Sequence, residues 1–239
     1  MEFLLDLNWW AVGQIVLIDI MLGGDNAIVI ALACRNLPPH LRLRGIIWGT
    51  IGAIALRIAL LAFAVTVLQL PYVKLIGGML LLWIAYKLLQ EDGTGHDEIT
   101  ASDRLLTAIK TIMIADVVMS MDNVVAVASA AEQVGGENQF ALVIFGILVS
   151  LPIVVWGSTL VLALMQRFPV IIVMGAALLG YLGAAMACAD VVIEHALEAK
   201  LNHLFVTIPL LDGKLSVPGL LGAIAVIVCA FAVKYRKTA

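Results

Sequence analysis

Residues 19–38 of the chain read DIMLGGDNAIVIALACRNLP, and residues 116–130 read DVVMSMDNVVAVASA. Both stretches set an Asp-x5-Asp-Asn pattern within long apolar runs. Six polar residues carry it: Asp19, Asp25, Asn26, Asp116, Asp122 and Asn123. A charged side chain in the centre of a membrane-spanning helix costs about 2.5–3.5 kcal/mol or more, so such residues are retained mainly where they have a partner and a function. The two stretches therefore predict both a membrane fold and a buried polar site.

The composition agrees with a membrane protein. Apolar residues make up 63% of the 239 residues, and charged residues only 13%. Soluble domains contain about half apolar and a quarter charged residues. The formal net charge is −3 and no basic block occurs, which gives no indication of nucleic-acid binding.

Seven apolar segments have the length of about 17–25 residues that a helix needs to cross a bilayer. They are Trp9–Ala33, Ile46–Leu68, Val73–Leu89, Ala108–Ala131, Phe140–Leu164, Val170–Ala189 and Val217–Val233. The sequence therefore predicts an all-α polytopic membrane protein with seven transmembrane helices.

An internal repeat relates the two halves of the chain. Asp116 follows Asp19 by 97 residues, and the same offset places Gly146 over Gly49. Each half has an odd number of spans, so two consecutive copies must enter the membrane from opposite sides. We predict a 3+3 inverted repeat plus one C-terminal helix, an architecture that places transport sites near the bilayer midplane. The expected parts are a first repeat (1–89), a charged cytoplasmic linker (90–107), a second repeat (108–189), an external loop (190–216) and a seventh helix with a basic tail (217–239).

Basic residues predict the orientation in the membrane, because cytoplasmic loops carry an excess of Lys and Arg. Ten of the 14 Lys and Arg residues fall on the side that holds the 90–107 linker and the C-terminal tail. We therefore expect a multi-pass protein of the cell membrane with its N-terminus outside and its C-terminus in the cytoplasm.

Helix geometry limits how each motif can gather its side chains. Asp19 and Asn26 are seven residues apart and share a helix face, whereas Asp25 points away from them. Gly23 and Gly24 directly precede Asp25, and glycine loosens a helix. Ser120 stands at the corresponding place in the second half. We expect a kinked or unwound segment at both places, more distorted in the first half, with freed carbonyls as further ligands.

The oxygen atoms of Asp and Asn side chains suit hard divalent ions such as Mn²⁺, Mg²⁺ and Ca²⁺. No His or Cys lies among the six motif residues, which argues against a structural zinc site or a copper(I) site. We expect no permanently bound cofactor. The expected partners are a divalent ion as transported substrate, protons and the lipid bilayer.

Arg57 is the one basic residue in the middle of a predicted span, and its repeat counterpart, Val154, is apolar. Two roles are open for it. It can act as an internal counter-ion that pairs with a carboxylate when the metal is absent, or it can form a fixed structural ion pair.

Closely spaced carboxylates cannot all ionise without cations, so metal and protons should compete for them. This competition is the minimal chemistry of a metal–proton antiporter. Outward movement of a divalent ion against 100 mV costs about 4.6 kcal/mol, and two inward protons would offset it. The residues themselves leave the direction open.

At residues 19–38 and 116–130 the sequence resembles the TerC family of membrane proteins, and most closely its YjbE-like branch within the lysine-exporter-like transporter superfamily. The resemblance covers nearly the whole chain. It implies export of Mn²⁺ and a part in metal ion homeostasis, and it implies that the acidic and Asn residues of both motifs bind the ion.

Three other functions are alternatives to the transport of a metal ion. An intramembrane aspartyl protease would carry a GxGD signature, but Leu22 stands where the first Gly should be. An enzyme is therefore not expected. An amino-acid exporter of the same superfamily would need a site for an ammonium and a carboxylate. A non-transporting partner that supplies metal to exported proteins is the third alternative.

Overall fold

A computed structural model describes most of the chain, namely residues 13, 16, 17, 19, 24–68, 70, 72–90, 100–134, 139–190, 192–193, 205–208 and 213–238. Side chains are described for these residues except 61–68, 122–134, 139–142, 205–208, 213–215, 230 and 233–238. The expected linker (90–107) and external loop (190–216) therefore lie partly outside the described residues.

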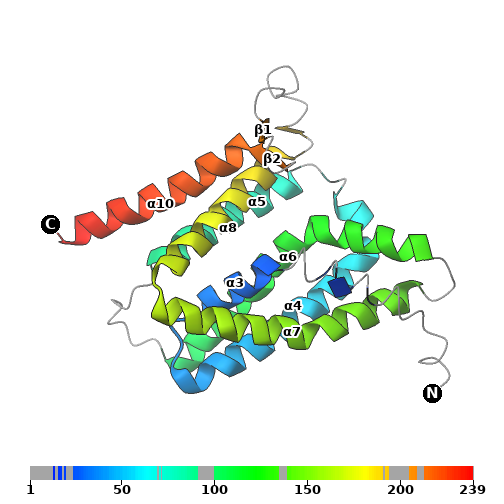
Figure 1. The fold of residues 1–239 in the computed structure, drawn as a ribbon, viewed down its shortest axis with the longest axis horizontal. Helices are drawn as coiled ribbons and strands as arrows, with labels where there is room; N and C mark the ends of the chain where they lie inside the picture. The colour runs from blue at the N-terminus through cyan, green and yellow to red at the C-terminus, as the bar shows by residue number, and fades with distance from the viewer. Residues whose placement is uncertain are drawn as a thin grey trace. The chain divides into compact units, whose positions relative to one another are not determined.

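The described residues form seven helices and one small hairpin (Figure 1). The helices are α3 (Gly24–Cys34), α4 (Pro39–Leu68), α5 (Val73–Gln90), α6 (Ala101–Val134), α7 (Gln139–Arg167), α8 (Val170–Cys188) and α10 (Val217–Thr238). The strands β1 (Phe205–Ile208) and β2 (Gly213–Ser216) pair antiparallel, with Phe205 opposite Ser216. The predominantly helical fold confirms the predicted class. The hairpin was not predicted, and it lies within the segment expected to be an external loop.

Four helices are long and apolar enough to cross a membrane within the described part of the chain. They cover Pro39–Leu60, Val73–Gln90, Val143–Arg167 and Val170–Cys188, and two shorter apolar helices cover Gly24–Cys34 and Val217–Cys229. Large apolar side chains such as Trp48, Trp83 and Trp156 are more than half exposed on these helices. This exposure fits helices whose outer surfaces face lipid instead of water.

Several helices begin at residues that reduce the number of unsatisfied backbone N–H groups in the first turn. Pro39 is the first residue of α4 and Pro218 is the second of α10, where the missing N–H of proline costs nothing. Thr100 precedes α6, and its Oγ accepts a hydrogen bond from the backbone N–H of Asp103 at 3.3 Å. This is the geometry of an N-cap, and it fixes the start of the longest described helix.

The chain divides into two compact units, Met1–Val65 with Ile99–Ala163 and Thr66–Glu98 with Leu164–Ala239. Each unit combines segments from both halves of the sequence. In the first unit α3 packs against α6, and in the second α5 packs against α8. Two of the three pairs of spans that correspond in the predicted repeat, the first with the fourth and the third with the sixth, are therefore neighbours in space.

In the second unit α5, α8 and α10 lie side by side, and β2 leads into α10 (Figure 1). Glycine permits the close approach of these helices. A Cβ atom at Gly183 would lie 2.7 Å from the carbonyl oxygen of Gly78, and one at Gly180 would lie 2.9 Å from that of Gly222. Small residues at such crossings let helix backbones touch, which is the main way helices associate in lipid.

Asp190, just after α8, caps the N-terminus of α5 from a distant part of the sequence. Its carboxylate is fully buried, with 1% of the residue exposed. It accepts hydrogen bonds from the backbone N–H groups of Tyr72 at 3.2 Å, Leu75 at 3.1 Å and Val192 at 3.1 Å. Tyr72 has a positive φ of 67°, a strained value for a bulky residue, and this contact helps to hold it.

Replacing Asp190 with alanine is expected to lower the free energy of unfolding by about 1–3 kcal/mol, because buried N–H groups lose their acceptor. Asp190→Asn keeps one acceptor oxygen and should cost less. Burial alone would raise the pKa of Asp190, but the N–H groups of Val192, Leu75 and Tyr72 hold it below its usual value. This stabilisation is therefore present above the unfolded-state pKa of about 4 and is lost as the pH falls through the lower folded pKa.

Hydrogen exchange at the first turn of α5 measures this effect in the intact protein. Faster exchange there in Asp190→Ala, with little change at the start of α6, is the expected result. Equal exchange in the variant and the unchanged protein would contradict the capping role.

Candidate functional site

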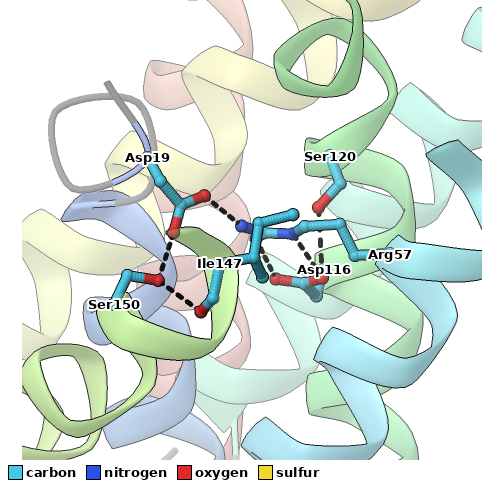
Figure 2. A network of polar contacts seen from close by, with 6 residues as sticks. All are labelled: Asp19, Arg57, Asp116, Ser120, Ile147 and Ser150. Carbon is cyan, nitrogen blue, oxygen red and sulfur yellow. Dashed lines mark hydrogen bonds and ion pairs between the residues drawn. The ribbon is translucent and has the colours of Figure 1, made fainter. Parts of the chain in front are cut away.

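Arg57 lies between the first acidic residue of each motif (Figure 2). Its Nη1 donates a hydrogen bond to Asp19 Oδ1 at 2.6 Å, and its Nη2 donates to Asp116 Oδ1 at 2.6 Å. Its Nε lies 3.4 Å from Asp116 Oδ2. A single guanidinium therefore bridges two carboxylates that are 97 residues apart in the sequence.

Two serine hydroxyls complete this network (Figure 2). Ser120 Oγ donates to Asp116 Oδ2 at 3.1 Å. Ser150 Oγ lies 2.5 Å from Asp19 Oδ2 and 2.8 Å from the carbonyl oxygen of Ile147, and its single proton can serve one of them at a time. Asp19 and Asp116 are thus each within hydrogen-bond distance of one serine hydroxyl and of the shared guanidinium.

The three charged residues are almost completely removed from solvent. Asp19 is 4% exposed, Arg57 6% and Asp116 7%. Two carboxylates against one guanidinium leave an excess of one negative charge in the group. Buried charges persist only where attraction and hydrogen bonds offset the loss of hydration. A buried group with more carboxylates than guanidinium groups is a candidate site for a further cation.

The sequence positions these groups through helix periodicity and close helix packing. Asp116 and Ser120 are four residues apart on α6 and share one face. Arg57 lies on α4, two turns beyond Gly49. A Cβ atom at Gly49 would collide with the side chain of Ile112 of α6, one turn before Asp116. The absence of a side chain at Gly49 therefore brings α4 close enough to α6 for Arg57 to reach Asp116.

The second acidic residue of the first motif, Asp25, is half-buried, and its neighbour Asn26 is buried. Asn26 is 5% exposed and lies in the first turn of α3 next to Asp25. Asp25 Oδ1 and Asn26 Oδ1 are shielded from solvent and have no hydrogen-bond partner in the described part of the chain. Oxygen atoms of this kind are candidates for binding a cation, because burial without a partner is costly.

Other predicted site residues are described only in part. Gly23 and the side chains of Asp122 and Asn123 lie outside the described residues, and α3 begins at Gly24. α6 runs as a helix without interruption through Ser120, so the segment is not unwound there, and a kink at Ser120 stays a prediction. The hydroxyl of Ser120 contacts Asp116. Among the described residues, no three His, Cys, Asp or Glu side chains are close enough together to hold a metal ion.

Ser150, which contacts Asp19 from α7, was not among the predicted site residues. A serine inside an apolar span was its only signal. Ser158 shows how weak this signal is, because it lies on the same helix and donates to the carbonyl oxygen of Val154. Such bonding to the preceding turn satisfies a hydroxyl within its own helix.

Long apolar helices and a buried group of charges define a multi-pass membrane protein. The comparison with known families agrees with this class. The family described as "Integral membrane protein TerC family" matches residues 5–238, and the chain belongs to this family.

Relatives of known sequence are membrane proteins as well. The chain is 44% identical to the membrane protein YjbE of Bacillus subtilis (strain 168) over 177 residues, which cover 74% of this chain and 78% of that protein. It is 27% identical to the inner membrane protein YgdQ of Escherichia coli (strain K12) over 178 residues, which cover 67% of this chain and 73% of that protein. No solved structure matches the chain significantly.

Proposed function

We propose that the protein carries a divalent metal ion across the membrane, with Mn²⁺ export coupled to proton entry as its reaction. The supporting observation is that the buried guanidinium of Arg57 forms ion pairs with both Asp19 and Asp116. These two residues are the first acids of the two motifs, so both halves of the chain contribute to one place. In this proposal Arg57 occupies that place when the transported ion is absent.

The chemistry of the available donors favours a hard divalent ion. All of these groups offer oxygen atoms as metal ligands. They are the carboxylates of Asp19 and Asp116, the hydroxyls of Ser120 and Ser150, and the side-chain oxygens of Asp25 and Asn26. Mn²⁺, Mg²⁺ and Ca²⁺ prefer such ligands. In the proposed complex the ion binds the two carboxylates that Arg57 releases, with Asp25, Asn26, Asp122 and Asn123 as further ligands.

The family's membrane architecture is proposed as seven spans in a 3+3 inverted repeat plus the C-terminal helix. The pairing of α3 with α6 and of α5 with α8 supports it, because these are the corresponding members of the two halves. An inverted repeat gives a transporter two related ways to open, one toward each side. The excess of basic residues on one side supports an external N-terminus and a cytoplasmic C-terminus.

Proton coupling follows from the charge of the site. Metal ions and protons both neutralise carboxylates, so each should expel the other. Two inward protons per exported divalent ion would make the cycle electrically neutral. This coupling would let the membrane's proton gradient drive export.

An amino-acid exporter of the same superfamily is less well supported. Its site would need a cation free to bind the substrate's carboxylate, whereas both terminal nitrogens of Arg57 already bind carboxylates of the chain. A non-transporting partner that supplies metal to exported proteins would bind the ion without carrying it. The flux experiment below separates these functions.

The test is ion flux into sealed liposomes that contain the purified protein, with an imposed pH gradient. Mn²⁺ is expected to move faster than Ca²⁺ or Mg²⁺, and collapse of the gradient by a proton ionophore should slow it. Movement of lysine without Mn²⁺ would favour the amino-acid exporter. Binding of Mn²⁺ without any flux would favour the metal-supply partner.

A further inference from the structure

We infer that Arg57 sets the valence selectivity of the site: it is a tethered monovalent cation that keeps Na⁺ and K⁺ away from Asp19 and Asp116 and yields only to a divalent ion. The inference rests on the proposed function, because it assumes that this carboxylate pair binds the transported ion. It assigns Arg57 a role in choosing the ion, beyond pairing with a carboxylate.

The geometry makes Arg57 a strong competitor for any free cation. Its two terminal nitrogens bind different carboxylates, each at 2.6 Å, so an entering ion must break both contacts. Charge-assisted hydrogen bonds of this kind are about twice as strong as neutral ones. The guanidinium is also attached to α4, so its effective concentration at the site far exceeds that of a free ion in solution.

The charge of the entering ion then decides the competition. Na⁺ or K⁺ brings the same single charge as Arg57 and has no directed N–H groups, so it has no electrostatic advantage over the guanidinium that already binds both carboxylates. A divalent ion doubles the attraction to each carboxylate at the same distance. It also neutralises both acids at once, which a monovalent ion cannot do.

The displaced guanidinium has another carboxylate nearby. Asp25 is near enough to Arg57 for their charges to interact, and Asp25 Oδ1 has no hydrogen-bond partner among the described residues. Transfer of Arg57 toward Asp25 would avoid leaving a buried cation without a partner. The exchange of Arg57 for a divalent ion is therefore possible within the same group of residues.

The experiment measures Mn²⁺ binding to the full-length protein in lipid nanodiscs, through the loss of the electron paramagnetic resonance signal of free Mn²⁺. The pH is fixed, and the salt is Na⁺, K⁺ or the bulky cation N-methylglucamine at the same ionic strength, so that screening is equal. The unchanged protein is expected to bind Mn²⁺ with the same affinity in all three salts.

The Arg57→Gln variant should bind Mn²⁺ about tenfold more tightly or better in N-methylglucamine, because its competitor is gone. Most of this gain should disappear in Na⁺ or K⁺, which can now enter the site. Arg57→Lys keeps a tethered charge and should bind Mn²⁺ without this sensitivity to salt. Arg44→Gln, which removes an exposed arginine of the same helix, is the matched control and should behave like the unchanged protein.

The possible results distinguish a failure of the inference about Arg57 from a failure of the proposed function. Competition of Na⁺ or K⁺ with Mn²⁺ in the unchanged protein would overturn the inference, even if Arg57→Gln failed to fold. So would a folded Arg57→Gln variant with weaker Mn²⁺ binding in every salt, the result expected of a purely structural arginine. Absence of Mn²⁺ binding to the unchanged protein would instead overturn the proposed function, and the inference with it.

Discussion

Mn²⁺ flux through the Asp116→Asn variant is expected to fall by about 100-fold or more, because changes in even the outer shell of a metal site cost 10–100-fold in affinity or activity. Asparagine has the shape of aspartate and can still accept the hydrogen bond from Ser120. The substitution therefore removes charge with little change in packing. Asp19→Asn should have the same effect, because the two acids hold equivalent places on Arg57.

The measurement is the initial rate of Mn²⁺ entry into liposomes, normalised to the amount of reconstituted protein. Asp103→Asn is the matched control, because Asp103 is an exposed acid at the start of the same helix. It should keep the flux of the unchanged protein. An Asp116→Asn variant that still transports Mn²⁺ at the control's rate would show that this carboxylate does not bind the ion.

Loss of Arg57 should have the largest effect on stability. Arg57→Gln leaves two buried carboxylates without their counter-charge, and breaking a buried ion pair in this way costs about 3–5 kcal/mol. Adding Asp116→Asn to this variant should restore part of the loss, because it removes one of the uncompensated charges. The two substitutions should therefore be non-additive by about 0.5–3 kcal/mol.

Equilibrium unfolding in mixed detergent micelles measures the free energies for the two single variants and the double variant. Arg42→Gln serves as the control, because Arg42 is half-buried on the same helix and donates only to the carbonyl oxygen of Leu37 among its described hydrogen bonds. Its loss should cost about 0.5–1.5 kcal/mol. Additive effects at Arg57 and Asp116 would mean that their contact contributes nothing to stability.

The helices of this fold could be predicted well from the sequence. Apolar runs of membrane-spanning length mark them, and proline and threonine mark several of their starts. The hairpin at β1 and β2 was not predicted, because each strand has only four residues, FVTI and GKLS, which is too short for a distinct alternating pattern.

The site was predicted only in part. The motif spacing predicted Asp19 and Asp116 as candidate site residues, and the position of Arg57 in a span left two roles open for it, an internal counter-ion or a fixed structural ion pair. The Arg57 guanidinium bridges both acids because α4 approaches α6 closely at Gly49. This approach is a tertiary contact, which the sequence pattern alone does not predict. The helix at Ser120 is not unwound, because serine can keep its backbone hydrogen bonds in a helix while its hydroxyl donates to Asp116.

We propose that a divalent ion takes the place of the Arg57 guanidinium between Asp19 and Asp116. Anomalous X-ray diffraction from Mn²⁺-loaded crystals, recorded at the manganese absorption edge, would locate the ion. We expect one peak about 2.0–2.6 Å from an oxygen atom of each carboxylate, with the guanidinium turned away. A Mn²⁺ peak elsewhere in the protein, with Arg57 still bound to both acids, would contradict it.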